Sequence, residues 1–286
     1  MFSHIVNLVR VKHWIKNLLV LAPAFFAQSL TNAAILELTF AFFSFSLMAS
    51  AVYVINDLSD KEQDQLDIRK KNRPLASGSI SVHVARLLII VLILASCLLA
   101  LSLTYEVLYL VLVYLFLNIL YSWKLKHVSL IDLLIVASGY VIRIFLGAIV
   151  VGVTISNWML VLTFLFALFL AIGRRSMNMD NNELIKARGA YSGYNAQFIT
   201  HVQVYLTSII TIAYIMYSIS PEVSLRVQTN HLYLTSLPVI IGFLRYFQIH
   251  LVEGSSIEPI QLITKDRVII GAIIVWLALF TYFLYF

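Results

Sequence analysis

Three aspartates at the end of a long apolar stretch are the side chains best placed for chemistry. Asp57, Asp60 and Asp64 are three and four residues apart, so on a continuing helix they share one face. Like charges at this spacing repel one another. Hard carboxylate oxygens suit Mg²⁺, which binds through one or two carboxylates together with substrate phosphates and water. The spacing therefore predicts a magnesium site, the alternative being a solvated acidic helix end.

Basic residues follow the aspartates within a few positions. Arg69, Lys70, Lys71 and Arg73 lie in a polar loop that extends over residues 58–82. Guanidinium and ammonium groups bind phosphates through charge-assisted hydrogen bonds. Asn56, just before the first aspartate, is suited to hold a phosphate or a metal-bound water. Acids and bases together predict a site for a phosphate ester complexed with magnesium.

The composition indicates an integral membrane protein. Of 286 residues, 61% are hydrophobic and 12% charged, whereas soluble domains have about 45–50% apolar and about 25% charged residues. We expect one all-α domain over residues 1–286, with an interfacial helix over 1–13 and nine transmembrane helices. Nine segments are long enough, or nearly so, to cross about 30 Å of hydrocarbon: 14–30, 34–57, 83–102, 105–122, 129–152, 157–174, 196–218, 233–250 and 267–285.

The distribution of basic residues predicts the orientation. All but two of the 20 Lys and Arg residues lie on one side of the predicted spans, and the basic side of a membrane protein is cytoplasmic. The N-terminus and the loops 58–82 and 175–195 are therefore expected in the cytoplasm and the C-terminus outside, in the cytoplasmic membrane among its lipids. This topology accounts for the net charge of +6 without a nucleic-acid partner. The sequence leaves a homo-oligomer open.

The aspartate pattern resembles that of the UbiA superfamily of membrane prenyltransferases. The first motif reads Asn56-Asp57-x-x-Asp60-x-x-x-Asp64, and the match continues in Arg73-Pro74-Leu75-Ala76-Ser77-Gly78, in Tyr121 to Lys126 and in Asp132 to Gly147. This resemblance implies a nine-helix bundle around a central cavity open to lipid, with polar cytoplasmic cap loops. It also implies an enzyme that holds Mg²⁺ and a diphosphate at the three aspartates.

The chain departs from the usual superfamily pattern after the sixth span. Most members carry a second aspartate-rich motif there, but this chain has Gly173-Arg174-Arg175, with Asp180 and Glu183 as the only nearby acids. Arginines in place of a second metal suggest a different anion, such as a monophosphate. With Trp14-Ile15-Lys16-Asn17 near the start, the chain is similar to the polyprenyl-phosphate phosphoribosyltransferase branch, which includes enzymes of decaprenyl phosphate. The similarity implies phosphoribosyl diphosphate as donor and a polyprenyl phosphate as nucleophile.

Eleven residues are the candidates for binding these substrates. Arg69, Lys70 and Arg73 are expected to clamp the pyrophosphate, and Lys16, Arg174 and Arg175 to receive the 5-phosphate or the lipid phosphate. The full set is Lys16, Asn56, Arg69, Lys70, Arg73, Lys124, Lys126, Arg143, Arg174, Arg175 and Tyr191.

Several candidates also have plainer explanations. Lys124 and Lys126 satisfy the excess of positive charge expected on the cytoplasmic side, and Tyr191 fits an aromatic belt at the interface. Arg143 lies near the middle of a span, where a charge costs at least ~2.5–3.5 kcal/mol and normally faces a cavity or a partner. We expect a cavity role or a buried ion pair for Arg143, and a snorkelling or structural arginine is the alternative.

Two other functions fit parts of the sequence. An ordinary prenyltransferase would attach a polyprenyl chain to an aromatic or other acceptor, but the missing second aspartate motif argues against it. A transporter would explain an arginine within the membrane. Its site would be expected near the membrane midplane, whereas the acidic cluster lies at one cytoplasmic end beside phosphate-type basic residues.

Overall fold

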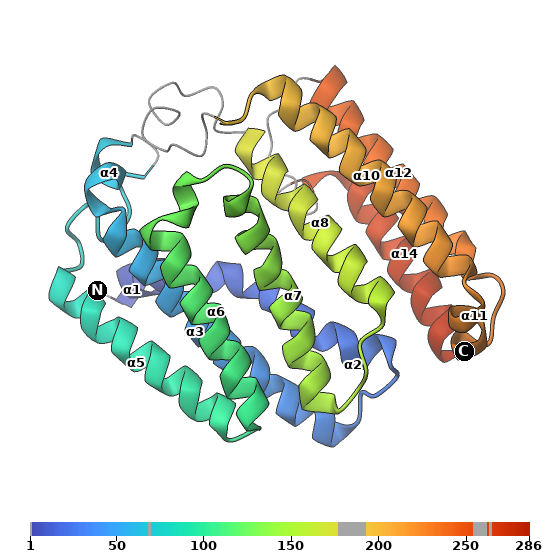
Figure 1. Ribbon diagram of the computed structural model, residues 1–286, viewed down its shortest axis with the longest axis horizontal. Helices are drawn as coiled ribbons and strands as arrows, with labels where there is room; N and C mark the ends of the chain where they lie inside the picture. The colour runs from blue at the N-terminus through green and yellow to red at the C-terminus, as the bar shows by residue number, and fades with distance from the viewer. Residues whose placement is uncertain (1, 68–69, 177–192, 254–261, 263–264) are drawn as a thin grey trace. The chain divides into compact units, whose positions relative to one another are not determined.

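The computed structural model is helical throughout the part of the chain that it describes, which excludes residues 1, 68–69, 177–192, 254–261 and 263–264 (Figure 1). Eight described helical segments are long and apolar enough to cross a membrane. The all-α membrane fold is confirmed. The chain divides into two compact units, Met1–Ile155 and Ser156–Phe286. The single domain over 1–286 stays a prediction.

The first unit contains α1 (Phe2–Val9), η1 (Val11–Leu21), α2 (Ala22–Phe26), α3 (Asn32–Ser59), α4 (Lys61–Leu66), α5 (Val82–Leu101), α6 (Tyr105–Trp123), η2 (Leu125–His127) and α7 (Ile131–Val151). The second contains α8 (Asn157–Ser176), α10 (Ala196–Ile219), α11 (Pro221–Val227), η4 (Leu232–Thr235), α12 (Ser236–Phe247), η5 (Gln248–Val252) and α14 (Arg267–Tyr285).

Most long helices begin at a polar side chain that accepts a hydrogen bond from the first turn. Thr31, Ser81 and Thr104 cap α3, α5 and α6 through bonds of 3.2–3.3 Å to backbone N–H groups. Asn195 and Asp266 cap α10 and α14 in the same way. Such caps satisfy N–H groups that have no partner within the helix. Short polar breaks between apolar runs therefore fix where the spans start.

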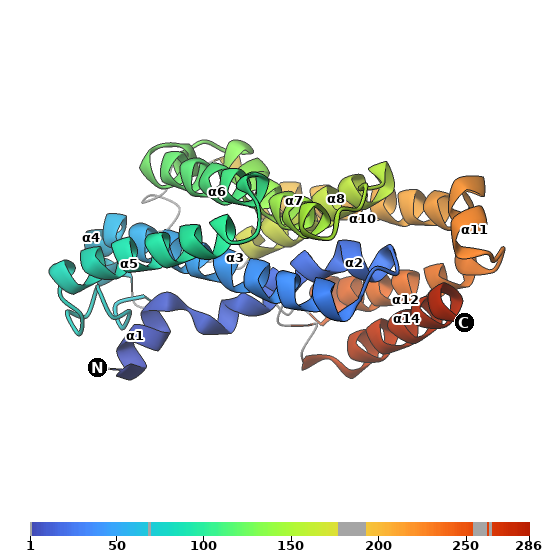
Figure 2. The same ribbon diagram turned by 90° about the horizontal axis from the view of Figure 1, so that it is seen from below.

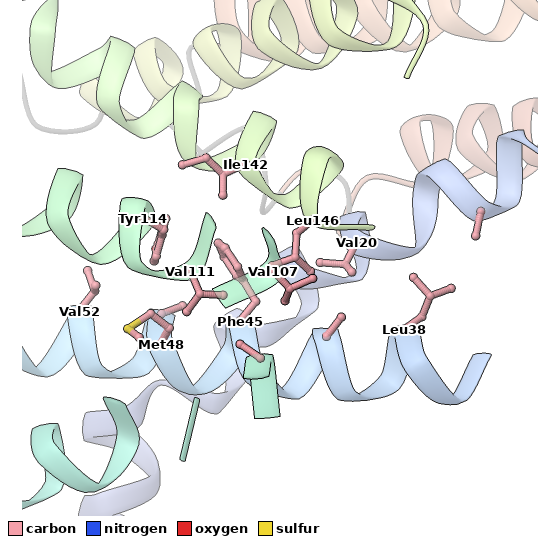
Figure 3. Close-up of a cluster of buried hydrophobic side chains, with 14 residues drawn as sticks. Val20, Leu38, Phe45, Met48, Val52, Val107, Val111, Tyr114, Ile142 and Leu146 are labelled. Carbon is pink, nitrogen blue, oxygen red and sulfur yellow. The ribbon is translucent and has the colours of Figure 1, made fainter. Parts of the chain in front are cut away.

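In the first unit, α3 is the central helix and packs against α5, α6 and α7. Figure 2 shows α1 on the opposite side of α3 from α6. A cluster of buried side chains joins α3 to α6, α7 and η1, and Figure 3 shows Phe45 and Met48 of α3 among Val111, Tyr114 and Leu146. The core of this unit lies beside the polar end of α3 and holds that end in place.

The first predicted span, 14–30, is wrong as a continuous transmembrane helix. The chain there forms the 3-10 helix η1 and the five-residue α2. A 3-10 helix places residues three apart on one face, and η1 presents Trp14 and Asn17 to Ser50 and Ser46 of α3 through hydrogen bonds of 3.0 and 2.9 Å. Three residues of a 3-10 helix and four of an α-helix both rise by about 6 Å. The tighter helix therefore matches the serine spacing on α3.

Gly147 allows η1 and α7 to approach closely. A Cβ atom built at this glycine would lie 1.9 Å from the carbonyl oxygen of Val20 and 3.3 Å from Cδ of Pro23. Backbone atoms of one segment thus occupy the space where any other residue of α7 has its side chain. The contact explains a glycine within a helix of otherwise bulky residues.

In the second unit, α10 packs against α8 and α12, and α12 against α14. Arg245 of α12 lies 2.9 Å from Asp266 and 2.8 Å from Glu253. Hydrogen bonding from Arg245 lowers the pKa of Asp266, which also caps α14. A cavity of about 180 Å³ lies between α8, α12 and α14, and apolar side chains such as Phe169, Phe243 and Trp276 line it.

Candidate active site

The three aspartates lie where α3 ends. Asp60 is the C-terminal cap of α3, with φ −94° and ψ 4°, and the next residues form the separate helix α4. The prediction of one continuing helix is therefore wrong, although Asp60 N still donates to Asn56 O at 2.9 Å and Asp64 N to Asp60 O at 2.8 Å. All three aspartates are buried. Buried carboxylates need partners, and the structure supplies basic ones.

Arg73 joins two of the aspartates. Its Nη1 atom lies 3.0 Å from Oδ1 of Asp57 and 2.6 Å from Oδ2 of Asp64. Lys70 Nζ lies 3.5 Å from Asp64 and 3.4 Å from Asp67. Two of the residues predicted to bind phosphate are thus within contact of the predicted metal ligands.

Buried apolar residues hold the loop that carries Arg73. Leu75 is 1% exposed and Ile80 5%, and both pack in a cluster formed with α1, α3 and α5. Gln65 of α4 donates to the carbonyl oxygen of Ala76 at 3.1 Å. The leucine of the Arg-Pro-Leu sequence is therefore an anchor, and it positions Arg73 beside the aspartates.

Arg10 is part of the same cluster and is absent from the eleven candidates. Its Nη2 atom lies 2.5 Å from Oδ1 of Asp57, and its guanidinium group lies 4.8 Å from the ring centre of Tyr53. Arg10 separates α1 from η1 and has a left-handed backbone, with φ 54°. That conformation is uncommon outside glycine. The sequence signal was a basic residue before the first apolar segment, which the expected cytoplasmic charge already explained.

Asp60 is paired from α6 and η2. Lys126 Nζ lies 2.5 Å from Asp60 Oδ1, and Ser122 Oγ donates to Asn56 Oδ1 at 2.6 Å. Lys126 is buried, whereas Lys124 is exposed. Of the two lysines predicted from this segment, the structure brings only Lys126 to the aspartates. Asn56 is hydrogen bonded beside them.

Arg143 forms a second buried polar cluster within the first unit. Its Nε donates to Asn17 Oδ1 at 2.8 Å and its Nη1 to the carbonyl oxygen of Gly139 at 2.6 Å, while Asn17 Nδ2 donates to Ser46 Oγ at 2.9 Å. Three aromatic ring centres lie 4.5–5.6 Å from the guanidinium carbon, those of Phe45, Tyr140 and Tyr114. Within the described residues Arg143 has amide, carbonyl and aromatic partners rather than the predicted carboxylate. Its substrate-binding role stays a prediction.

Substituting Asn17 by Ala is expected to destabilise the protein by about 1–3 kcal/mol, because Arg143 Nε and Ser46 Oγ lose a buried partner. Thermal unfolding in detergent measures the change. Asn32→Ala is the matched control, since Asn32 is exposed in the first turn of α3. Equal melting temperatures for the two variants would show that the hydrogen bonds of Asn17 do not stabilise the fold.

The remaining candidates lie apart from this cluster or outside the described residues. Lys16 is half-buried in η1. Arg174 and Arg175 lie in the last turn of α8, in the second unit, and Arg175 is buried. Arg69 and Tyr191 fall outside the described residues. Their roles stay predictions.

The donor atoms at the end of α3 fit a magnesium ion. Asp57 Oδ1 and Asp64 Oδ2 converge on one cationic nitrogen of Arg73, and Mg²⁺ is bound through one or two carboxylates plus phosphate and water. Asp60 faces Lys126 instead, and among the described residues no group of three Asp, Glu, His or Cys side chains is arranged to hold a metal. Asp57 and Asp64 would hold the ion; the ligand role of Asp60 stays a prediction.

Comparison with known sequences gives matches over nearly the whole chain. The model of the UbiA prenyltransferase family matches residues 17–262. The chain is 29% identical to the decaprenyl-phosphate phosphoribosyltransferase of Mycolicibacterium smegmatis, over 99% of this chain and 93% of the relative. It is 27% identical to the enzyme of the same name from Mycobacterium tuberculosis (strain H37Rv), over 96% and 92% of the two chains.

Solved structures show the same fold. A UbiA homologue from Archaeoglobus fulgidus bound to DMAPP and Mg²⁺ aligns with a TM-score of 0.74 at 20% identity, over 96% of this chain and 98% of the other. An apo UbiA homologue from Aeropyrum pernix K1 aligns with a TM-score of 0.67 at 17% identity, over 93% and 98%.

Proposed function

The chain belongs to the UbiA prenyltransferase family, and on this premise we propose that it transfers 5-phosphoribose from phosphoribosyl diphosphate to a polyprenyl phosphate and releases pyrophosphate. The observation that carries the proposal is the similarity, along nearly the full length of both chains, to bacterial relatives named decaprenyl-phosphate phosphoribosyltransferase. Arg174 and Arg175, in place of a second aspartate motif, support a donor with a separate monophosphate.

The reaction breaks the bond between C1 of the ribose and the pyrophosphate oxygen, and forms a bond between C1 and an oxygen of the lipid phosphate. The attacking phosphate is already anionic, so the site needs no strong general base. Bound Mg²⁺ would stabilise the charge of the departing pyrophosphate. The chain's own task is to bring two anions together, and basic side chains offset their repulsion.

The described basic residues are arranged for that task. Arg10, Lys70, Arg73 and Lys126 all contact aspartates at the end of α3. Guanidinium groups bind phosphate oxygens bidentately, and lysine acts as a point charge. We place this site at the cytoplasmic face of the cytoplasmic membrane, where a soluble donor and a lipid acceptor both have access.

Transfer is tested with purified protein, phosphoribosyl diphosphate labelled in the ribose, decaprenyl phosphate and Mg²⁺. We expect label to enter the organic phase only when all components are present, and pyrophosphate to appear in equal amount. A parallel reaction contains a labelled polyprenyl diphosphate and an aromatic acceptor. Label that stays in the aqueous phase of the first reaction contradicts the proposal, and prenylated acceptor in the second would favour an ordinary prenyltransferase.

A further inference from the structure

The cluster at the end of α3 contains as many basic side chains as carboxylates. Its carboxylates are Asp57, Asp60, Asp64 and Asp67, and the basic side chains that contact them are Arg10, Lys70, Arg73 and Lys126. The charges therefore compensate one another within the cluster. A divalent cation reaches these carboxylates only if basic groups move away from them.

Arg10 and Arg73 are the groups best placed to move. Both lie on the same atom, Asp57 Oδ1, with nitrogens at 2.5 and 3.0 Å, so one oxygen is shared by two cations. The side chains of Arg10 and Arg73 are 21% and 30% exposed, whereas that of Asp57 is 3% exposed. The two guanidinium groups reach solvent from the carboxylate, and the carboxylate itself is fixed at the end of α3.

We propose that Arg10 and Arg73 exchange partners when substrate binds: they leave Asp57 and Asp64 to the divalent cation and bind the diphosphate that arrives with it. Arg73 Nη1 already lies between the two carboxylates, where a cation would have both as ligands. A free divalent ion would displace the arginines and leave them without an anion. A metal diphosphate supplies the cation for the carboxylates and the anion for the arginines together.

The exchange rests on the proposed function for the presence of a diphosphate donor, and it adds an order of binding. The cation binds tightly only as its diphosphate complex. It also gives Arg10 a role in holding the diphosphate.

The test is Mn²⁺ binding to the full-length protein in detergent, with and without inorganic pyrophosphate. Protein-bound Mn²⁺ is measured by electron paramagnetic resonance after separation from free and pyrophosphate-bound ion. In the wild-type protein we expect pyrophosphate to tighten Mn²⁺ binding at least tenfold. Arg73→Gln is expected to bind Mn²⁺ alone at least tenfold more tightly than the wild-type protein and to lose most of the effect of pyrophosphate. Arg10→Gln should shift both values in the same direction.

Lys71→Gln is the matched control, because Lys71 is exposed in the same loop and loses the same charge. Its Mn²⁺ affinity should equal that of the wild-type protein. Asp64→Asn should remove tight Mn²⁺ binding under both conditions; tight binding that persists would place the ion elsewhere and overturn the proposal.

Two further results would also overturn the exchange. One is wild-type protein that binds Mn²⁺ equally well with and without pyrophosphate, a measurement that needs no variant to fold. The other is Arg73→Gln with unchanged or weaker Mn²⁺ affinity. The assay contains neither ribose nor lipid, so a failed transfer reaction would count against the proposed function and leave the exchange standing.

Discussion

Asp57→Asn is expected to lower the rate of transfer by at least roughly 10³-fold, which corresponds to about 4 kcal/mol of barrier. The substitution keeps the size of the side chain and removes the charge on which Arg10 and Arg73 meet. Without that charge the site loses a cation ligand, and the leaving pyrophosphate loses stabilisation. Initial rates with labelled donor at saturating Mg²⁺ measure the effect.

The fold should survive this substitution, because Arg73 keeps Asp64 as a partner at 2.6 Å. Glu62→Gln is the matched control: it removes one acidic charge from exposed α4, two residues from Asp60. We expect near-wild-type rates from the control. Substantial activity of folded Asp57→Asn would show that this carboxylate is not a metal ligand and would move the site away from the end of α3.

The eight long spans were predictable because hydropathy and capping residues act locally. Apolar runs of about 20 residues, separated by Ser, Thr, Asn or Asp, predict helix starts that the structure reproduces at α3, α5, α6 and α14 within two residues. The proximity of Arg73 to the aspartates was predictable in kind, since it follows them in the same loop. Lys126 was also a candidate, although its neighbour Lys124 turned out to be exposed.

The features that the sequence did not reveal depend on contacts between distant segments. Arg10 reaches Asp57 across 47 positions of sequence because a left-handed residue turns the chain between α1 and η1. The 3-10 form of η1 follows from serines on α3, and no pattern within residues 11–21 indicates it. Arg143 is stabilised by Asn17, 126 residues away, so a search for a nearby carboxylate missed its partner.

The helix break at Asp60 has a similar origin. Periodicity favoured a single helix that presents three carboxylates on one face, which would concentrate their repulsion. In the structure Asp60 faces Lys126 while Asp57 and Asp64 converge on Arg73. Basic partners from three other segments thus decide where each acid points, and helical spacing alone does not contain that information.

Gly147→Ala is expected to destabilise the protein by about 3 kcal/mol or more, at the upper end of the cost of overpacking. The added methyl group would lie 1.9 Å from the carbonyl oxygen of Val20, so η1 and α7 must separate. A rotamer change cannot relieve this clash, because the obstructing atom belongs to the backbone. Thermal unfolding should show a melting temperature lower by roughly 6–12 °C.

Gly271→Ala in α14 is the matched control, since its Cβ would meet no heavy atom within 4 Å. This change should leave stability unchanged or raise it by up to about 1 kcal/mol, because Ala favours a helix over Gly. Folded Gly147→Ala should also transfer more slowly, since η1 begins at Arg10 and displacement of η1 moves that guanidinium from Asp57. If Gly147→Ala melted with the wild-type protein, the tight contact between η1 and α7 would be wrong, and the placement of Arg10 would lose its structural basis.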